Sequence, residues 1–326
     1  MAVDHPQAKP RPRRGLLRAV ALQIALVVVT LAVCEAILRA VDLRYLRESR
    51  AGYGLTYAYD AELGWLPVAN SVGQYVGMRA THISHNSLGL RDIELGGAAG
   101  KTILFLGDSF VWGYDVETDD RFTERLRRDL PQLRIVNGGI AGYGTDQQVL
   151  LLRRLWDRIK PDVVVLVFCT ENDRRDNSTN SRYGGHFKPY LELLPDGSAQ
   201  FRGQPVPKSR HVYFAENPLA HHSWVARVVV SAFVELAHPA VHVADPTERL
   251  IGMMRDFVQT HGARFMIGLQ DNGSGLEPFL TAQNIPFKSL EGAEHYFGDG
   301  DHWTPNGHAF VAQRLSALLS ETGAIP

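Results

Sequence analysis

Three continuous apolar runs, separated by segments of helical character, constrain the fold of this chain more than any other feature. The runs occupy residues 102–106, 133–136 and 162–168, and the last of them is rich in β-branched valine. Strands that are covered on both faces carry continuous rather than alternating apolar residues. The pattern therefore predicts a buried parallel sheet in which strands and helices alternate.

Helices are expected between the runs, over residues 121–130 and 145–160. Thr145 and Gln148 have the spacing of a capping box at the start of the second helix. Further elements are expected as a helix near 246–261, a strand over 264–269, a strand near 287–290, and a helix from Pro305 with Thr304 as its N-cap. This order predicts an α/β fold, a three-layer α/β/α sandwich with a mainly parallel sheet.

An uncharged stretch near the N-terminus, residues 19–34, belongs to an apolar pattern that extends over residues 16–38. A helix over the longer range is about 34 Å long, which spans a bilayer core of about 30 Å. A cleaved signal peptide and a buried soluble helix are the alternatives. We expect an uncleaved single-pass transmembrane anchor, and the distribution of basic residues slightly favours a cytoplasmic tail over residues 1–15.

Charge and cysteine content exclude several classes of function. The 34 Lys and Arg residues nearly balance the 35 Asp and Glu residues, so nothing in the net charge of −1 suggests a nucleic-acid partner. Two cysteines, Cys34 and Cys169, exclude a disulfide framework and a multi-cysteine metal site. The paired histidines near 221 and 302 lack a convincing third ligand, so we expect neither a metal nor a cofactor.

Two segments differ in character from the alternating pattern. Residues 39–99 are expected to form a short juxtamembrane helix and then irregular chain with at most a strand. Residues 173–245 interrupt the pattern, with a hairpin that pairs 191–194 with 200–201 and a helix over about 219–236. Because this insertion follows the carboxyl end of a strand, where open α/β sheets bind ligands, it is expected to act as a substrate-selecting lid.

A serine and a histidine that could form a catalytic pair stand at opposite ends of the α/β region. Ser109 directly follows the first apolar run, so the sheet would hold it rigidly and expose it as a nucleophile. The Gly-Asp-Ser sequence around it is also ordinary turn chemistry. Asp299 and His302 have a spacing that lets the carboxylate bond Nδ1 while Nε2 faces the serine. His302 is preferred as the base over His295 and His308.

Two further strand ends carry candidate donors for an oxyanion hole. Gly142 follows the second run and can bring its N–H close to a substrate without a side chain, and Asn172 follows the third run and can donate from its amide. Gly and Asn are also common loop residues. Together with the N–H of Ser109, they would form a three-donor pocket at three neighbouring strand ends.

These four blocks, Gly107-Asp108-Ser109, Gly142, Asn172 and Asp299-x-x-His302, resemble in order the SGNH, or GDSL-type, hydrolases. The resemblance covers residues 101–326 and implies an SGNH or flavodoxin-like sandwich in a domain over residues 100–326. It implies that Ser109 is the nucleophile, that His302 and Asp299 are the base and its supporting acid, and that Ser109, Gly142 and Asn172 form the oxyanion hole.

The anchor and the segments 86–91 and 142–147 resemble those of membrane-anchored bacterial SGNH proteins, and residues 302–308 resemble alginate O-acetyltransferase proteins. The resemblance implies a bacterial inner-membrane protein with a periplasmic or otherwise extracytoplasmic catalytic domain. The expected activity is a serine esterase acting on an ester-bearing small molecule or an acylated glycan. The alternatives are an O-acetyltransferase or deacetylase of an extracytoplasmic polysaccharide, and a non-catalytic, membrane-tethered carbohydrate-binding protein.

Overall fold

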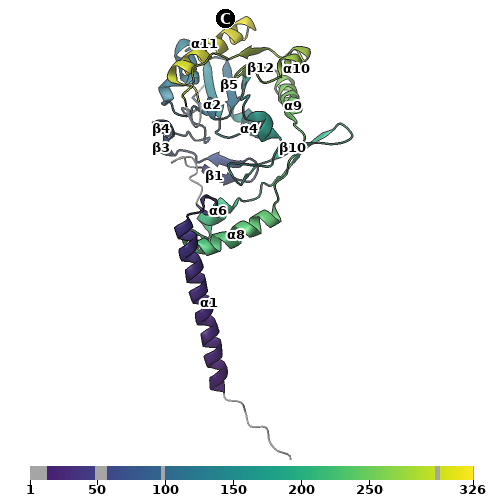
Figure 1. Cartoon of the computed structure of the whole chain (residues 1–326). Coiled ribbons are helices and arrows are strands. Elements are labelled where there is room, and N and C mark those ends of the chain that lie inside the picture. The colour runs from purple at the N-terminus through teal and green to yellow at the C-terminus, as the bar shows by residue number, and fades with distance from the viewer. Residues whose placement is uncertain (1–12, 48–56, 97–99, 298–301, 326) are drawn as a thin grey trace, which may run out of the picture.

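The computed structural model describes residues 13–47, 57–96, 100–297 and 302–325. An α/β domain lies at one end of the molecule, and the long N-terminal helix α1 (Arg13–Val41) projects from the other end (Figure 1). The segments before and within the α/β pattern lie between these two parts.

A five-stranded parallel sheet forms the centre of the α/β domain, in the order β13-β12-β7-β5-β6. This order places the first strand of the pattern between the second and the third, as in flavodoxin-like folds. The prediction of a parallel sheet is therefore confirmed. The strands are β5 (Thr102–Gly107), β6 (Arg134–Gly139), β7 (Val163–Phe168), β12 (Arg264–Leu269) and β13 (Phe287–Ser289).

Helices cover both faces of this sheet and create two apolar cores. One core contains buried residues of α4 and α9, and the other contains buried residues of α3 and α11. The three-layer sandwich is confirmed. The bounds of the covering helices are α3 (Phe122–Asp129), α4 (Thr145–Ile159), α9 (Thr247–Thr260), α10 (Glu277–Ala282) and α11 (Pro305–Glu321).

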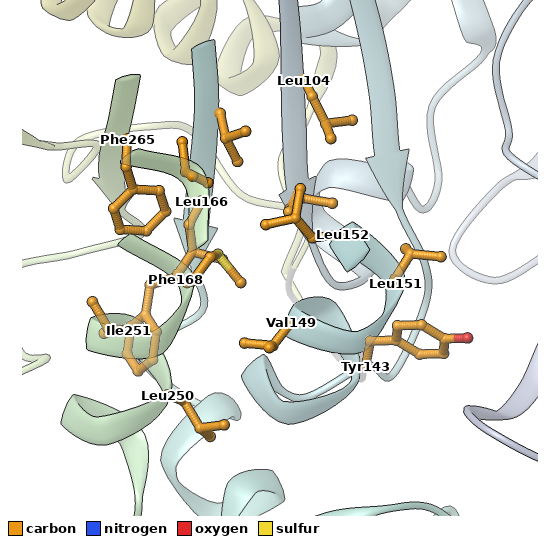
Figure 2. Packing of buried hydrophobic residues seen from close by; sticks show 14 of the residues in the cluster. Leu104, Tyr143, Val149, Leu151, Leu152, Leu166, Phe168, Leu250, Ile251 and Phe265 are labelled. Carbon is orange, nitrogen blue, oxygen red and sulfur yellow. The ribbon is translucent and has the colours of Figure 1, made fainter. Parts of the chain in front are cut away.

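Figure 2 shows how the first core is filled. Leu166 and Phe168 of β7 point from the sheet towards Val149 of α4 and towards Leu250 and Ile251 of α9. All five side chains are almost completely buried. Each side chain of this size contributes about 1.5–3 kcal/mol when it is removed from water, so the continuous apolar runs fix the sheet between its helices.

The helix caps agree with the sequence in one case and differ in another. Thr304 caps α11 as predicted, because its Oγ1 accepts a hydrogen bond of 3.1 Å from the N–H of Gly307. The predicted Thr145 and Gln148 capping box is wrong by one residue. The side chain of Gln147 accepts from the N–H of Gly144 at 3.3 Å, and Thr145 is already the first helical residue. The preceding glycine takes the extended backbone conformation that an N-cap requires.

The segment before the α/β domain is more regular than expected. The short juxtamembrane helix is present as a 3-10 turn, η1 (Arg44–Leu46). In place of irregular chain, the structure has two hairpins, which the short and only partly buried strands hid in the sequence. Their strands are β1 (Tyr57–Asp60), β2 (Gly64–Pro67), β3 (Val72–Val76) and β4 (Ala80–Ser84).

These hairpins pack against the loops at the carboxyl end of the sheet. Trp65 of β2 donates from Nε1 to the carbonyl of Ala141 at 3.2 Å and accepts at its own carbonyl from the hydroxyl of Tyr143 at 2.5 Å. Buried Arg91 donates to the carbonyls of Trp112 and Gly113, and its guanidinium lies 4.4 Å from the Trp112 ring centroid. Residues 57–96 therefore form part of the wall around the strand ends.

The insertion over residues 173–245 contains the predicted hairpin, in which Leu191 pairs with Phe201. The single helix predicted over 219–236 is instead broken at Ser223, because this serine caps a new helix: its Oγ accepts from the N–H of Ala226 at 3.2 Å. The elements are α5 (Asp173–Asn177), β8 (Ser181–Arg182), β9 (His186–Phe187), β10 (Tyr190–Leu193), β11 (Ala199–Arg202), α6 (Arg210–Glu216), α7 (Pro218–His222) and α8 (Trp224–Ala237).

Helix α1 is long and apolar enough over Gly15–Val41 to cross a membrane, and no residue in its most apolar part is buried inside the protein. A signal sequence meets the same criteria of length and composition. The C-terminal end of α1 lies beside α8 (Figure 1).

Candidate active site

Ser109 lies at the carboxyl end of β5, where a short helix, α2 (Ser109–Trp112), begins. Asp108 caps this helix, since its Oδ1 accepts from the N–H of Phe110 at 3.0 Å. A Cβ at Gly107 would lie 2.4 Å from Cγ2 of Val111, so the strand can pass under the helix only at a glycine. The Gly-Asp-Ser sequence therefore forms a tight strand-to-helix turn that fixes the position of Ser109.

The structure brings Ser109 and His302 together although 193 positions separate them in the chain. Nε2 of His302 lies 2.8 Å from Oγ of Ser109. The imidazole is held by the rings of Phe110 and Tyr114, whose centroids are each 4.8 Å from its own. Tyr114 did not stand out in the sequence, because only the turn after α2 brings it back to the histidine.

Burial lowers the pKa of His302 to about 3, and the charge of nearby His295 acts in the same direction. The imidazole is therefore neutral at neutral pH, and its Nε2 can accept the proton of the serine hydroxyl. The neutral tautomer that accepts at Nε2 carries its hydrogen on Nδ1, which needs an acceptor of its own.

Asp299, predicted to be that acceptor, lies outside the described residues. Nδ1 of His302 is buried, and no residue in the described parts of the chain forms a hydrogen bond with it. Of the other histidines that the sequence offered, His295 lies near this pair, with its ring centroid 5.8 Å from that of Phe110. His308 is buried on α11, and its Nδ1 accepts from the N–H of Phe122 at 3.3 Å, which is a structural contact.

The two predicted oxyanion donors both lie at neighbouring strand ends. The amide of Asn172 is oriented by Arg175, which donates to its Oδ1 at 2.7 Å, so that its Nδ2 lies 3.5 Å from Oδ2 of Asp108. The loop that carries Gly142 is tied to the end of β5, because the N–H of Ile140 donates to the carbonyl of Gly107 at 3.1 Å. Gly142 itself has a φ of +76°, a conformation that favours glycine.

Asp108 connects the turn that carries Ser109 to the third strand end, a contact that was not predicted. Burial raises the pKa of Asp108, whereas hydrogen bonds from the N–H of Phe110, from Cys169 and from Asn172 act in the opposite direction. Burial also raises the pKa of its neighbour Asp173, whose Oδ2 accepts from the N–H of Cys169 at 3.0 Å. A buried acidic pair therefore lies directly beneath the site.

The insertion contributes Tyr183 to the same edge of the sheet. A Cβ at Gly142 would lie 2.3 Å from Cε2 of Tyr183, so this ring packs directly on the glycine. Trp65 lies on another side of the ring, at 6.3 Å between centroids, and the guanidinium of Arg182 lies 5.0 Å from it. Arg182 is in turn paired with buried Asp176. The sequence could predict an overhanging insertion, but it could not indicate which of its residues reaches the strand ends.

A cavity of about 820 Å³ extends from this edge towards α1. Its walls include Arg175 and Tyr183 near the strand ends, and Tyr45 and Arg210 at the other end. The guanidinium of Arg210 lies 4.0 Å from the Tyr45 ring centroid. The cavity therefore contains guanidinium groups that are paired with Asp176 and Glu235. It borders the candidate oxyanion residue Asn172 through Arg175, which donates to the Asn172 amide oxygen.

Metal binding finds no support in the described residues, where no group of three or more His, Cys, Asp or Glu side chains is placed to hold an ion. The paired rings of His221 and His222 lie on α7, 4.7 Å apart, well away from Ser109 in the chain.

A five-stranded parallel sheet with helices on both faces is an α/β hydrolase-like fold. Residues 105–310, more than half of the chain, match the GDSL-like lipase/acylhydrolase family. The chain belongs to this family, and it is an ester-bond hydrolase or an acyltransferase. The comparison with curated proteins gives no match.

Several solved structures are similar to this chain at low identity. TesA is 14% identical with a TM-score of 0.41, and the match covers 68% of this chain and 99% of TesA. The psychrotrophic esterase EstA from Pseudoalteromonas sp. is 10% identical with a TM-score of 0.40, over 69% and 100% of the two chains. An acetylxylan esterase from Geobacillus stearothermophilus is 13% identical with a TM-score of 0.37, over 69% and 96%.

Proposed function

We propose that the protein is a serine esterase that cleaves acetyl or other short-chain acyl esters with Ser109 as nucleophile and His302 as base. The observation that carries this proposal is the contact of 2.8 Å between Oγ of Ser109 and Nε2 of His302. A neutral, buried imidazole at this distance suits a general base. Asp299 is assigned to Nδ1 of His302, where it would orient the ring and stabilise the imidazolium.

In the first half of the reaction, Oγ of Ser109 attacks the acyl carbonyl carbon while His302 takes the hydroxyl proton. The carbonyl oxygen becomes an oxyanion, for which the N–H groups of Ser109 and Gly142 and the Nδ2 of Asn172 would be the donors. When the tetrahedral intermediate collapses, the ester C–O bond breaks and His302 returns the proton to the leaving alcohol. The product is an acyl-serine.

In the second half, an acceptor hydroxyl attacks the acyl-serine and His302 again serves as base. If the acceptor is water, the products are a free carboxylic acid and the regenerated serine. If the acceptor is a sugar hydroxyl, the acyl group is transferred and a new ester forms. The two outcomes share every residue of the site and differ only in what occupies the space around it.

The cavity beside Asn172 favours a second candidate, acyl transfer to or deacetylation of an extracytoplasmic polysaccharide. Its volume of about 820 Å³ exceeds what a short acyl chain needs, and its walls carry Arg175, Arg182 and Arg210 together with their ion-pair partners Asp176 and Glu235. Guanidinium groups donate hydrogen bonds to hydroxyl oxygens and carboxylates accept them from hydroxyl groups, so a glycan would find partners of both kinds there. The cavity would then hold the sugar portion of the donor or the acceptor.

We also propose that α1 is retained as an inner-membrane anchor with the catalytic domain in the periplasm. Support comes from specific contacts between α1 and the insertion. Glu35 of α1 accepts from the N–H of Trp224 at 3.0 Å, and Arg39 donates to the carbonyl of His222 at 2.5 Å. These contacts between α1 and the insertion would be lost if α1 were a signal peptide that is cleaved off after export.

The test is hydrolysis of a p-nitrophenyl ester series, from acetate to longer acyl chains, by the full-length protein in detergent. We expect turnover with the short esters and a loss of at least about 10³-fold in Ser109→Ala. The matched control is Ser178→Ala, which removes a hydroxyl that follows α5 and donates to the carbonyl of Arg174 at 2.8 Å. Equal turnover by the wild type and Ser109→Ala would refute the nucleophile. Glycan retention without any turnover or reaction at Ser109 would favour the non-catalytic, carbohydrate-binding alternative.

A further inference from the structure

Helix α8 carries an apolar face that the protein leaves open. Val229, Phe233 and Leu236 are 65, 64 and 86% exposed, and their spacing of four and three residues places them on one side of the helix. Glu235 is the one charged residue among the exposed positions of α8. Leu219 of the preceding helix α7 extends this face and is 69% exposed. We call these four apolar residues the α7–α8 face.

The opposite side of α8 is fixed to the rest of the protein, so the helix cannot turn this face inward. Buried Arg227 donates to the carbonyls of Ala220 at 2.7 Å and Leu46 at 2.9 Å. Val234 is buried against Phe187 and Val206 in a small core of the insertion. The orientation of the α7–α8 face is therefore set by packing and by buried hydrogen bonds.

Glu35 holds the start of α8 at a defined level along α1. It is the first charged residue after the uncharged stretch 19–34. Its carboxylate accepts from Oγ of Ser223 at 2.9 Å and from the N–H groups of Trp224 and Val225, each at 3.0 Å. The first N–H groups of a helix have no partner within the helix, and a carboxylate is a favourable cap for them. The N-terminus of α8 thus lies where the apolar part of α1 ends.

From that point, α8 runs across the end of α1 rather than along it (Figure 1). If the uncharged stretch of α1 occupies the hydrocarbon core, Glu35 lies at the boundary between the core and the headgroups. A helix that starts there and runs crosswise stays within the headgroup region along its whole length. Amphipathic helices in this position bury their apolar face by about 5–10 Å in the lipid.

A groove between the two helices is suited to the same surroundings. It has a volume of about 600 Å³ and is lined by Leu31 and Ala32 of α1 and by Val225 and Val229 of α8. Glu35 and Arg39 lie along one side of the groove and are bonded to each other at 2.7 Å. An apolar groove that opens beside a membrane-spanning helix is filled by lipid acyl chains.

We propose that the α7–α8 face is a membrane-docking surface that lies in the lipid interface beside α1. This inference rests on the proposed membrane anchor, and it adds a second attachment to it. One spanning helix alone leaves a domain free to tilt and rotate above the bilayer. Two attachments hold the domain in one orientation, with the hairpins and the carboxyl edge of the sheet on the side of the membrane (Figure 1).

The experiment places a nitroxide spin label at single cysteines of the full-length protein in lipid nanodiscs. Cys34 is exposed and is replaced by alanine in all variants, whereas Cys169 is buried. The reporters are Phe233→Cys and Leu236→Cys. Power-saturation EPR measures the collision rates of the label with O₂, which concentrates in lipid, and with a water-soluble nickel chelate. We expect collisions with O₂ to dominate at both positions.

Two controls make the result specific. Ser320→Cys on α11, at the end of the molecule opposite α1, is expected to collide mainly with the nickel chelate. Val27→Cys, within the uncharged stretch of α1, is expected to collide mainly with O₂. A lipid signal at 27 with an aqueous signal at 233 and 236 would overturn the docking surface alone. An aqueous signal at 27 would overturn the anchor as well.

Low collision rates with both reagents at 233 and 236 would overturn the proposal in favour of a second copy of this chain covering the face. Ester hydrolysis is measured on the same labelled samples. Because the labelled positions lie outside the catalytic site, activity is expected to persist. The failure of the esterase proposal therefore remains distinguishable from the failure of the docking surface.

Discussion

Replacing Gly142 by alanine tests how tightly the fold constrains the proposed oxyanion loop. The residue has a φ of +76°. An added Cβ would lie 2.3 Å from Cε2 and 2.5 Å from the hydroxyl oxygen of Tyr183. Alanine would therefore suffer both backbone strain and a steric clash with a ring from the insertion.

The two effects have separate magnitudes. A left-handed conformation costs about 1–2 kcal/mol for a residue with a Cβ. Overpacking in a core typically adds about 1–3 kcal/mol, and the lower end applies here because the Tyr183 ring is half-exposed and can shift. We expect Gly142→Ala to lower the free energy of unfolding by about 2–3 kcal/mol. We also expect kcat to fall by about 10²-fold or more, because a displaced N–H removes one oxyanion donor.

Gly197→Ala is the matched control. Gly197 has a φ of +81° in the hairpin turn, and nothing lies within 4 Å of a Cβ there, so its cost is strain alone. Urea unfolding and p-nitrophenyl acetate hydrolysis are measured for both variants, and for Gly142→Ala in a Tyr183→Ala background. The reasoning is refuted if Gly142→Ala loses no more stability than Gly197→Ala, or if removal of the Tyr183 ring does not reduce the loss.

Three further predictions follow from buried charges and histidines. Burial and the charge of His295 lower the pKa of His302 to about 3, and a carboxylate at Nδ1 would raise it. Asp299→Ala should therefore lower kcat and move the acid limb of the kcat/KM profile to lower pH, and coincident limbs would exclude Asp299 as the partner. Burial lowers the pKa of His308 well below its usual value, so as the pH falls below about 6.5 this histidine takes up a proton in the unfolded state but not in the folded state, and the free energy of unfolding decreases. His308→Asn should reduce the difference in unfolding free energy between pH 7 and pH 5, measured by urea titration, and an unchanged difference would contradict this. Lys188 and Asp146 form a fully buried ion pair, so Lys188→Met alone leaves a buried carboxylate without its partner and should lower the free energy of unfolding by about 3–5 kcal/mol. The double variant Lys188→Met, Asp146→Leu should recover much of this loss, and equal losses of unfolding free energy in the single and double variants would contradict the prediction.

The sheet could be predicted because its sequence signal is local. All six residues of β7 are buried between helices on both faces, which a continuous apolar run of this length already indicates. Thr304 and Pro305 similarly mark the first turn of α11 by local chemistry alone. The alternation of strands and helices predicts that the sheet is parallel, whereas the order of its strands is seen in the structure.

The hairpins before the domain could not be predicted in the same way. In β4 only alternate residues are buried over five positions, which is too short a pattern to separate a strand from loop. Their stability depends on distant contacts, such as that of Trp65 with the carbonyl of Ala141. No local feature of the sequence encodes such a contact.

The residues of the candidate site likewise fall into those that local sequence could predict and those that depend on distant contacts. Ser109 and His302 could be paired from sequence because each lies next to a predictable element of the sheet domain, and the structure places them in contact. Tyr114 and Tyr183 reach the site through a turn and an insertion, so their positions depend on the whole fold. The left-handed φ of Gly142 and the close packing of the insertion on this residue are seen only in the structure.

Covalent capture of Ser109 tests the central claim most directly. The full-length protein is treated with a p-nitrophenyl phosphonate ester, and the modified residue is identified by peptide mass spectrometry. The account predicts one phosphonylated residue, Ser109, and slow or absent labelling in His302→Ala, which lacks the base. Stoichiometric labelling at another serine, or equally fast labelling of Ser109 without His302, would contradict it.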